Sequence, residues 1–146
     1  MRYFLITISV GIAALVAFML FKHSSVAVPP KRNPAPSDYG TGITFDEAQK
    51  SNKPMAINFY VDWCHTCRAF APVFDSYRAK YSDKYNFLIV KADNPENINI
   101  VKYFYIPGYP TVYFVSADKS KKARVDFEKY FDEKAFKQEL DTFLKN

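Results

Sequence analysis

The spacing of apolar residues divides the chain into segments with two different periods. From Asp38 onward, strand-length apolar runs alternate with stretches in which apolar residues recur every three or four positions, the period of an amphipathic helix. The runs predict strands at 55–61, 87–90, 111–115 and 123–127. Helices are predicted at 44–51 and 96–104, after Cys64 and after Asp132. This order predicts an α/β fold, a central sheet with helices on both faces.

Local signals mark the ends and faces of these elements. Thr44 with Glu47 three residues later is a capping box, and Asp132 is suited to cap the last helix. Pro72 lies inside the helix that follows Cys64 and is expected to kink it. That helix carries one apolar stripe, made of Phe70, Val73, Phe74, Tyr77 and Tyr81.

The first 37 residues have a different pattern. Residues 3–21 carry no charge, and as a helix with a rise of about 1.5 Å per residue they would reach roughly 28 Å, close to the thickness of a bilayer core. We predict a transmembrane anchor over 1–22. The alternatives are a signal peptide cleaved near Ala27 and a buried core helix. Residues 23–37 contain four prolines and predict an extended linker before a domain at 38–146.

Charge is concentrated in that first segment. The formal net charge is +5, and no acidic residue precedes Asp38, whereas four basic residues do: Arg2, Lys22, Lys31 and Arg32. The domain itself is therefore close to neutral, which does not favour nucleic-acid binding. We interpret the basic residues within 119–124 as solvated surface charge. Basic residues flank 3–21 on both sides, and by the positive-inside rule this count alone does not favour a domain that faces outward. We still predict an exported domain, because signal-like N-termini commonly lead export.

The two cysteines of the chain, Cys64 and Cys67, are three positions apart at a strand-to-helix junction. This spacing lets both sulfur atoms meet across the first turn of the helix. The unpaired N–H groups and the positive end of the helix dipole favour a thiolate at Cys64. The pattern predicts a redox-active dithiol in which Cys64 attacks a disulfide and Cys67 resolves the mixed disulfide. A static disulfide and a metal site shared with a partner are the alternatives.

Residues beside the cysteines are candidates for shaping this site. A protonated His65 would stabilise the thiolate of Cys64 further, whereas a solvated His65 would have little effect. Trp63 either shields the site or lies in the core, and Thr66 lies between the cysteines. We interpret Asp62 as an exposed loop acid rather than a proton carrier.

Two motifs are typical of one known family. The first is Trp63-Cys-His-Thr-Cys-Arg68, with Pro72 five residues after the second cysteine, and the second is Ile106-Pro-Gly-Tyr-Pro-Thr111. Through them, residues 42–146 resemble the thioredoxin family. The resemblance implies a thioredoxin fold with a central mixed sheet, and thiol–disulfide exchange without a cofactor or metal. It also implies a cis peptide bond before Pro110, facing the disulfide, with Tyr109 offering its backbone to an extended substrate.

A finer resemblance implies a location and partners. Residues 123–136 and the segment before Cys64 look like the exported C-terminal domain of transmembrane thiol–disulfide interchange proteins, and anchored thioredoxin-like proteins of cytochrome c maturation are similar. This resemblance implies a single-pass inner-membrane reductase whose domain faces the periplasm. Its partners would be protein disulfide substrates and a dithiol electron donor. The alternative functions are a binding module or chaperone without redox turnover, and a metal carrier.

The chain departs from the family pattern at Asn58 and in the loop at 129–130. Asn58 stands where thioredoxins usually have a buried aspartate, which leaves open how Cys67 loses its proton. Lys91 matches a buried family lysine, and it either acts on Cys67 or extends to solvent. Lys129 and Tyr130 occupy a loop where the family often has glycine, so their bulk would restrict or reshape substrate access.

Overall fold

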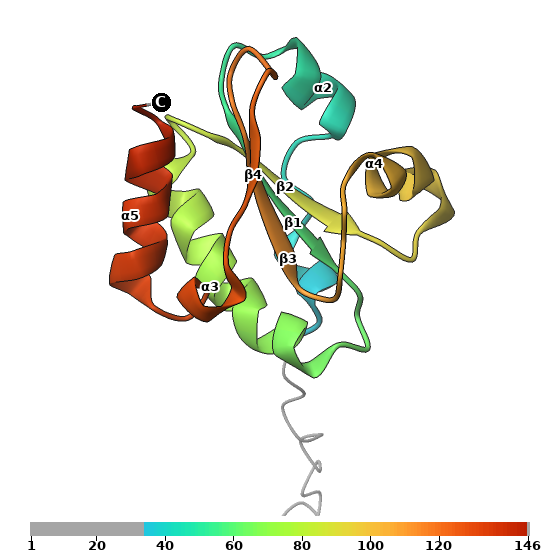
Figure 1. Ribbon diagram of the computed structural model, residues 1–146. Helices are drawn as coiled ribbons and strands as arrows, with labels where there is room; N and C mark the ends of the chain where they lie inside the picture. Colours follow the sequence, from blue (N-terminus) through green and yellow to red (C-terminus); the bar gives the residue numbers. More distant parts are fainter. Residues whose placement is uncertain (1–33, 146) are drawn as a thin grey trace, which may run out of the picture. The chain divides into compact units, whose positions relative to one another are not determined.

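The computed structural model describes residues 34–145, which build a four-stranded mixed sheet with helices on both faces (Figure 1). The α-helices are α2 (Phe45–Lys50), α3 (His65–Tyr81), α4 (Ile98–Tyr103) and α5 (Glu133–Phe143). The strands are β1 (Met55–Tyr60), β2 (Asn86–Lys91), β3 (Thr111–Val115) and β4 (Lys122–Arg124). Short 3-10 helices lie at η1 (Pro36–Tyr39), η2 (Pro95–Asn97) and η3 (Phe127–Lys129).

The sheet is built around β1. Its strand order is β2-β1-β3-β4, with β1 parallel to β2 and the other two pairs antiparallel. All six residues of β1 are buried, which confirms the buried central strand predicted there. The end of β1 leads directly into the cysteine segment, so a rigid strand fixes the position of the site.

Helices α3 and α5 cover one face of the sheet, and α2 and α4 lie on the other (Figure 1). The side chains of β1 alternate between the two faces, as a strand requires. Ala56 and Tyr60 pack in the cluster with α3 and α5, whereas Met55, Ile57 and Phe59 pack in the cluster with α2 and α4. The prediction of helices on both faces is confirmed.

The capping signals are present in the structure. Thr44 Oγ1 accepts a hydrogen bond from the backbone N–H of Glu47 at 3.2 Å, and a Glu47 carboxylate oxygen accepts from the backbone N–H of Thr44 at 2.9 Å. At the start of α5, Asp132 Oδ1 accepts from the backbone N–H of Ala135 at 3.0 Å. The predicted stripe of α3 is buried at four of its five positions, Phe70, Phe74, Tyr77 and Tyr81.

The strand predicted at 123–127 is wrong at its C-terminal end, because β4 covers only Lys122–Arg124. The cause is the hydroxyl of Tyr130. It accepts a hydrogen bond from the backbone N–H of Val112 at 2.7 Å and donates one to the carbonyl of Val125 at 3.3 Å. The backbone N–H of Val125 still donates to the carbonyl of Val112 at 3.0 Å, but the Tyr130 hydroxyl bridges the reciprocal pair, so the regular ladder ends here and the chain turns into η3.

The helix predicted at 96–104 is shorter in the structure. Residues Pro95–Asn97 form η2, and the α-helix α4 begins only at Ile98. Asn94 caps η2, since its Oδ1 accepts from the backbone N–H of Glu96 at 3.1 Å. The proline and the asparagine cap favour a tight first turn before the α-helix starts.

The predicted anchor at 1–22 and most of the predicted linker at 23–37 lie outside the described residues. Within residues 34–145, no helix has the length and apolar composition that spanning a membrane requires. The last residues of the predicted linker contact the domain. The hydroxyl of Ser37, in η1, donates to the carboxylate of Asp62 at 2.9 Å.

Candidate active site

Cys64 lies at the junction between β1 and α3, where it is the N-cap residue of the helix. Its backbone is extended (φ −77°, ψ 115°), and its Sγ accepts a hydrogen bond from the backbone N–H of Cys67 at 3.1 Å. The sulfur thus occupies the position of a capping oxygen, at the positive end of a 17-residue helix. Both features favour a thiolate over a thiol at Cys64.

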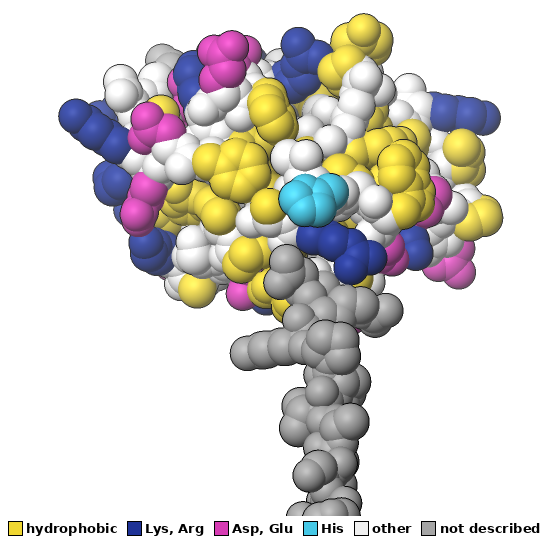
Figure 2. Space-filling model, turned by 90° about the horizontal axis from the view of Figure 1, so that it is seen from below, with side chains coloured by type: hydrophobic (Ala, Val, Ile, Leu, Met, Phe, Trp, Pro, Cys, Tyr) yellow, Lys and Arg dark blue, Asp and Glu magenta, His cyan; other side chains and the backbone are white. Residues whose placement is uncertain are grey.

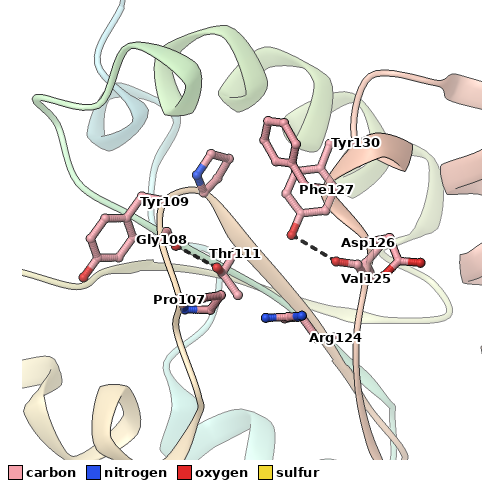
Figure 3. Close-up of a pocket in the computed structure, with 10 residues that line it drawn as sticks. Pro107, Gly108, Tyr109, Thr111, Arg124, Val125, Asp126, Phe127 and Tyr130 are labelled. Carbon is pink, nitrogen blue, oxygen red and sulfur yellow. Dashed lines mark hydrogen bonds between the residues drawn. The ribbon is translucent and has the colours of Figure 1, made fainter.

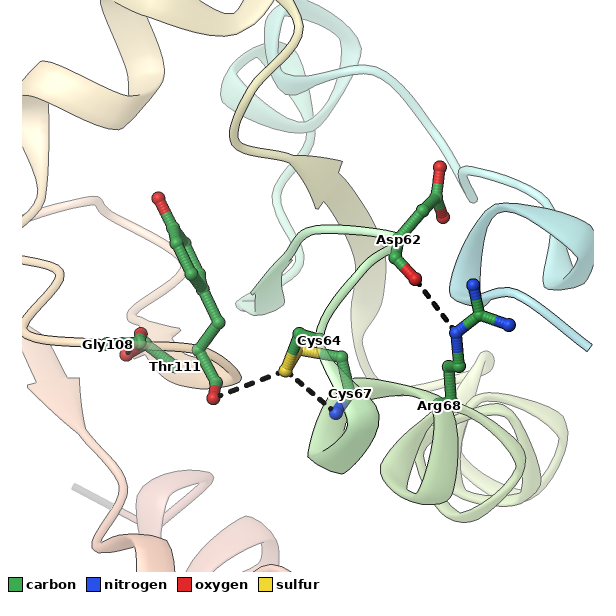
Figure 4. Close-up of a disulfide and its surroundings, with 7 residues drawn as sticks. Asp62, Cys64, Cys67, Arg68, Gly108 and Thr111 are labelled. Carbon is green, nitrogen blue, oxygen red and sulfur yellow. Dashed lines mark hydrogen bonds between the residues drawn. A yellow bond between two sulfur atoms is a disulfide. The ribbon is translucent and has the colours of Figure 1, made fainter. Parts of the chain in front are cut away.

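Cys64 and Cys67 form a disulfide, with their Cα atoms 5.2 Å apart (Figure 4). The two residues differ in accessibility. Cys64 is 9% exposed, whereas Cys67 is 1% exposed and packs in the cluster beneath α3. A sulfur atom arriving from outside therefore reaches Cys64 first.

The loop before β3 lies against Cys64. The peptide bond between Tyr109 and Pro110 is cis, as the resemblance implied, and the carbonyl oxygen of Tyr109 is 3.5 Å from Cys64 Sγ. The hydroxyl of Thr111 donates to the carbonyl of Gly108 at 2.7 Å and fixes the turn. The structure thus holds the backbone of Tyr109 beside the disulfide. Its part in substrate binding stays a prediction.

The side chains around the cysteines lie on an open face of the molecule. Trp63 is 74% exposed and its ring makes an edge contact with that of Tyr109, at 6.3 Å between centroids, which excludes the core position considered for Trp63. His65 is exposed and Thr66 is half-buried. Figure 2 shows hydrophobic side chains gathered on this end of the domain, with basic side chains among them.

Asp62 is not a free loop acid, because it holds an ion pair. The ammonium of Lys91 lies 2.8 Å from Asp62 Oδ2, and Ser37 donates to Oδ1. Burial alone would raise the pKa of Asp62, but the hydrogen bonds from Lys91 and Ser37 outweigh burial and lower its pKa. The hydrogen bond with Asp62 raises the pKa of Lys91 in turn. Lys91 therefore extends to the surface and pairs there.

Asn58 occupies the face of β1 that packs against α3. It is 1% exposed, and it shares this face with Ala56 and Tyr60, which belong to the same cluster as Cys67. Among the described residues, its Oδ1 accepts no hydrogen bond. The face of β1 toward the resolving cysteine thus presents a neutral amide where thioredoxins usually have a carboxyl group.

A pocket beside Pro110 was not predicted from the sequence. It has a volume of about 310 Å³ and is lined by the loop before β3, by Arg124 at the end of β4, and by Asp126, Phe127 and Tyr130. We had interpreted Arg124 as solvated surface charge. Linear spacing gave no signal for this pocket, since only the pairing of β3 with β4 brings its two sides together.

The described residues contain few groups that could bind a metal ion. Within residues 34–145, no group of three His, Cys, Asp or Glu side chains is placed to hold a metal ion. His23, the other histidine of the chain, lies outside those residues. The disulfide pair Cys64–Cys67 is the redox-capable group that this part of the chain presents.

Known proteins are similar in sequence to the described domain. Protein disulfide-isomerase A4 of Bos taurus is 34% identical over 99 residues, 66% of this chain and 15% of that protein. The chloroplastic thioredoxin-like protein HCF164 of Arabidopsis thaliana is 29% identical over 85 residues, 58% of this chain and 33% of its own length. The matched segment thus spans a third or less of these relatives.

Solved structures agree on the fold. Thioredoxin NaTrxh from Nicotiana alata superposes with a TM-score of 0.54 at 23% identity, covering 68% of this chain and 80% of that one. Oxidised thioredoxin O1 from Arabidopsis thaliana also superposes with a TM-score of 0.54 at 23% identity. The match covers 68% of this chain and 89% of that one. The family model described as Thioredoxin matches residues 40–142, most of the chain and both motifs. This chain therefore belongs to the thioredoxin family.

Proposed function

We propose that this protein is a thiol–disulfide oxidoreductase that reduces disulfide bonds of other proteins through Cys64 and Cys67. The placement of Cys64 carries the proposal: it caps α3, it is more exposed than Cys67, and it lies beside the backbone of Tyr109. The relatives of this protein include protein disulfide-isomerases and thioredoxins, which supports thiol–disulfide chemistry.

The reaction begins from the dithiol form. The thiolate of Cys64 attacks one sulfur of a substrate disulfide, forming an intermolecular S–S bond and releasing the other substrate sulfur as a thiolate that takes up a proton. Cys67 then loses its proton and attacks Cys64 Sγ. The Cys64–Cys67 disulfide forms and the reduced substrate leaves. Two electrons have passed to the substrate, and a donor dithiol restores the Cys64–Cys67 dithiol by the same exchange.

Single-cysteine variants test this sequence of steps. We expect Cys64→Ser to lose measurable reduction of insulin disulfides, because the accessible nucleophile is gone. Cys67→Ser should instead accumulate mixed disulfides on Cys64, seen by mass spectrometry after acid quenching. Ala69→Ser, at an exposed position of α3 outside the cysteine pair, is the control and should keep wild-type turnover. Wild-type turnover in both cysteine variants would refute the proposal.

The reducing direction rests on the resemblance to exported reductases. A more reducing potential favours electron flow toward substrates, and 30 mV corresponds to about 1.4 kcal/mol for this two-electron couple. Titration of the purified protein against glutathione buffers measures the potential. A reduction potential typical of strongly oxidising thiol–disulfide oxidoreductases would make the protein an oxidase and overturn the reductase assignment.

We further propose that residues 3–21 anchor the protein in the inner membrane as a single pass, with the domain on the periplasmic side and a dithiol donor there. The uncharged run in the sequence supports this. Carbonate extraction of membranes distinguishes the anchor from secretion after cleavage near Ala27. A membrane-impermeant thiol reagent applied to intact cells should label Cys64 if the domain faces outward, and labelling only after lysis would contradict that orientation.

A second candidate function, a binding module without redox turnover, is favoured by one observation. Several large aromatic side chains are exposed in the described part of the chain, among them Trp63, Tyr105, Phe127 and Phe131. Exposed aromatic groups of this kind are suited to hold unfolded segments of partners. A double Cys64→Ser, Cys67→Ser variant that fully complements a deletion strain would establish this function, whereas loss of function supports the oxidoreductase.

A further inference from the structure

The pocket beside Pro110 adjoins the reacting sulfur. Pro107, Gly108, Tyr109 and Pro110 form one wall, and the same Tyr109 carbonyl lies 3.5 Å from Cys64 Sγ. A polypeptide segment that places its cysteine on Cys64 and runs along this loop therefore passes over the pocket. Side chains of an extended segment point alternately to its two sides, so one flanking side chain is directed into the pocket.

The walls of the pocket are already fixed in the absence of a ligand. The Tyr130 hydroxyl joins the backbone of Val112 to that of Val125, and the hydroxyl of Thr111 bonds the carbonyl of Gly108. Tyr130 is buried and its ring stacks on Phe70, at 4.8 Å between centroids. A preformed wall loses little conformational freedom on binding, which favours selective recognition.

Two charged side chains of opposite sign line the pocket, Arg124 and Asp126. Arg124 forms no ion pair with any residue in the described part of the chain, and its guanidinium lies 5.9 Å from the centre of the Tyr105 ring. The carboxylate of Asp126 lies 3.4 Å from the ammonium of Lys129, which also pairs with Glu139 at 2.6 Å, so Arg124 is the charged lining residue that no ion pair in residues 34–145 engages. Figure 3 shows Arg124 across the pocket from the rings of Phe127 and Tyr130.

We propose that this pocket receives an acidic side chain that flanks the reacting cysteine of the substrate, and that Arg124 is the specificity-determining residue. The inference rests on the proposed function and names its substrate class: disulfides in acidic sequence surroundings. A guanidinium pairs with a carboxylate through two parallel hydrogen bonds, which gives geometric selectivity that a lysine would not. The apolar rings of Phe127 and Tyr130 contact the methylene groups of the same side chain.

The test uses full-length protein and disulfide-bridged peptides that become fluorescent when reduced. The peptides are identical except for Glu, Gln or Lys at one position, which is moved stepwise through the three residues on either side of the cysteine. At the position that enters the pocket, we expect kcat/KM for the Glu peptide to exceed that for the Lys peptide by about fivefold or more, a preference that weakens with added salt.

Variants assign the preference to one side chain. Arg124→Gln should make the Glu and Lys peptides equivalent, and Arg124→Glu should reverse their order. Lys122→Gln is the matched control, since it removes a positive charge from the same exposed strand but does not line the pocket. It should keep the wild-type preference.

The outcomes separate this inference from the proposed function. A Glu-to-Lys ratio that is the same in wild type and Arg124→Gln, with turnover that still needs Cys64, overturns the specificity proposal and leaves the oxidoreductase standing. A wild-type preference for Lys peptides overturns it as well. If wild type reduces no peptide faster than Cys64→Ser, the proposed function fails and the specificity proposal fails with it.

Discussion

Asn58 bears on only one of the two steps of the proposed thiol–disulfide exchange. The attack by Cys64 needs a thiolate at the helix N-terminus, which the local structure favours. The second step needs a proton acceptor for Cys67, and the buried amide of Asn58 cannot act as one. Lys91 is paired with Asp62 at the surface, so its charge is already compensated. We expect resolution of the mixed disulfide to be the slower step.

Asn58→Asp tests this expectation. Burial raises the pKa of a carboxyl group toward neutrality, where it becomes a suitable base, so resolution of the mixed disulfide should be about 10-fold faster or more near pH 8. Rapid acid quenching and mass spectrometry measure the lifetime of the mixed disulfide.

The stability of Asn58→Asp should also depend on pH. The new carboxyl group has a raised pKa in the folded state, so the variant should match wild type best below pH 4 and lose stability as the pH rises through that raised pKa. Asn86→Asp is the control, since Asn86 pairs with Met55 at the opposite end of β1 from the cysteines, and it should not change the lifetime. An unchanged lifetime in Asn58→Asp would contradict a role for this position in proton transfer.

At the scale of elements, a side-chain hydroxyl group bridges β3 and the chain just after β4. Periodicity was sufficient to predict β1, β2, β3 and the main helices, because their patterns reflect burial on one or two faces. It failed at 125–127, where the hydroxyl of Tyr130, the residue after η3, bonds Val112 and Val125. The pocket and Arg124 were missed for the same reason: they depend on a contact between segments that no local pattern encodes.

Tyr130→Phe should therefore destabilise the domain by about 1–3 kcal/mol, because a buried N–H and a buried carbonyl lose their partner. Burial raises the pKa of Tyr130 to about 12, so the hydroxyl stays protonated and the difference should hold at every pH below 10. Denaturant unfolding measures it. Tyr105→Phe, at an exposed ring, should change the free energy of unfolding by less than about 0.5 kcal/mol, and an equal effect of the two would exclude the bridging role.

At the scale of the whole molecule, Asp62 connects segments far apart in the sequence. Its carboxylate binds Ser37 of η1 and Lys91 of β2, and its carbonyl accepts a hydrogen bond from Arg68 Nε at 2.8 Å. The sequence placed the cysteines and the Pro110 loop through their motifs. It could not reveal this network, because a lone acid beside a loop has many potential partners until the fold selects them.

Asp62→Asn should reduce stability in a pH-dependent way. Because the pKa of Asp62 is lowered in the folded state from its ordinary value of 3.8, its contribution is present above that value and is lost as the pH falls through the lowered pKa. The variant should therefore melt at a lower temperature than wild type at pH 7, and the gap should close toward pH 2. Asp83→Asn, at an exposed turn after α3, should show no such dependence. A gap that stays constant from pH 7 to pH 2 would contradict the ion pair.

The exposed indole of Trp63 has a practical consequence. It is the one tryptophan in the chain, it precedes Cys64 directly, and its ring touches that of Tyr109. A disulfide quenches the emission of an adjacent indole, so opening the Cys64–Cys67 bond would brighten the protein. A polypeptide that binds over the Pro110 loop would exclude water from the Trp63 indole and shift its emission to shorter wavelength. The molecule thus contains its own fluorophore, able to distinguish electron transfer from docking in real time without a label.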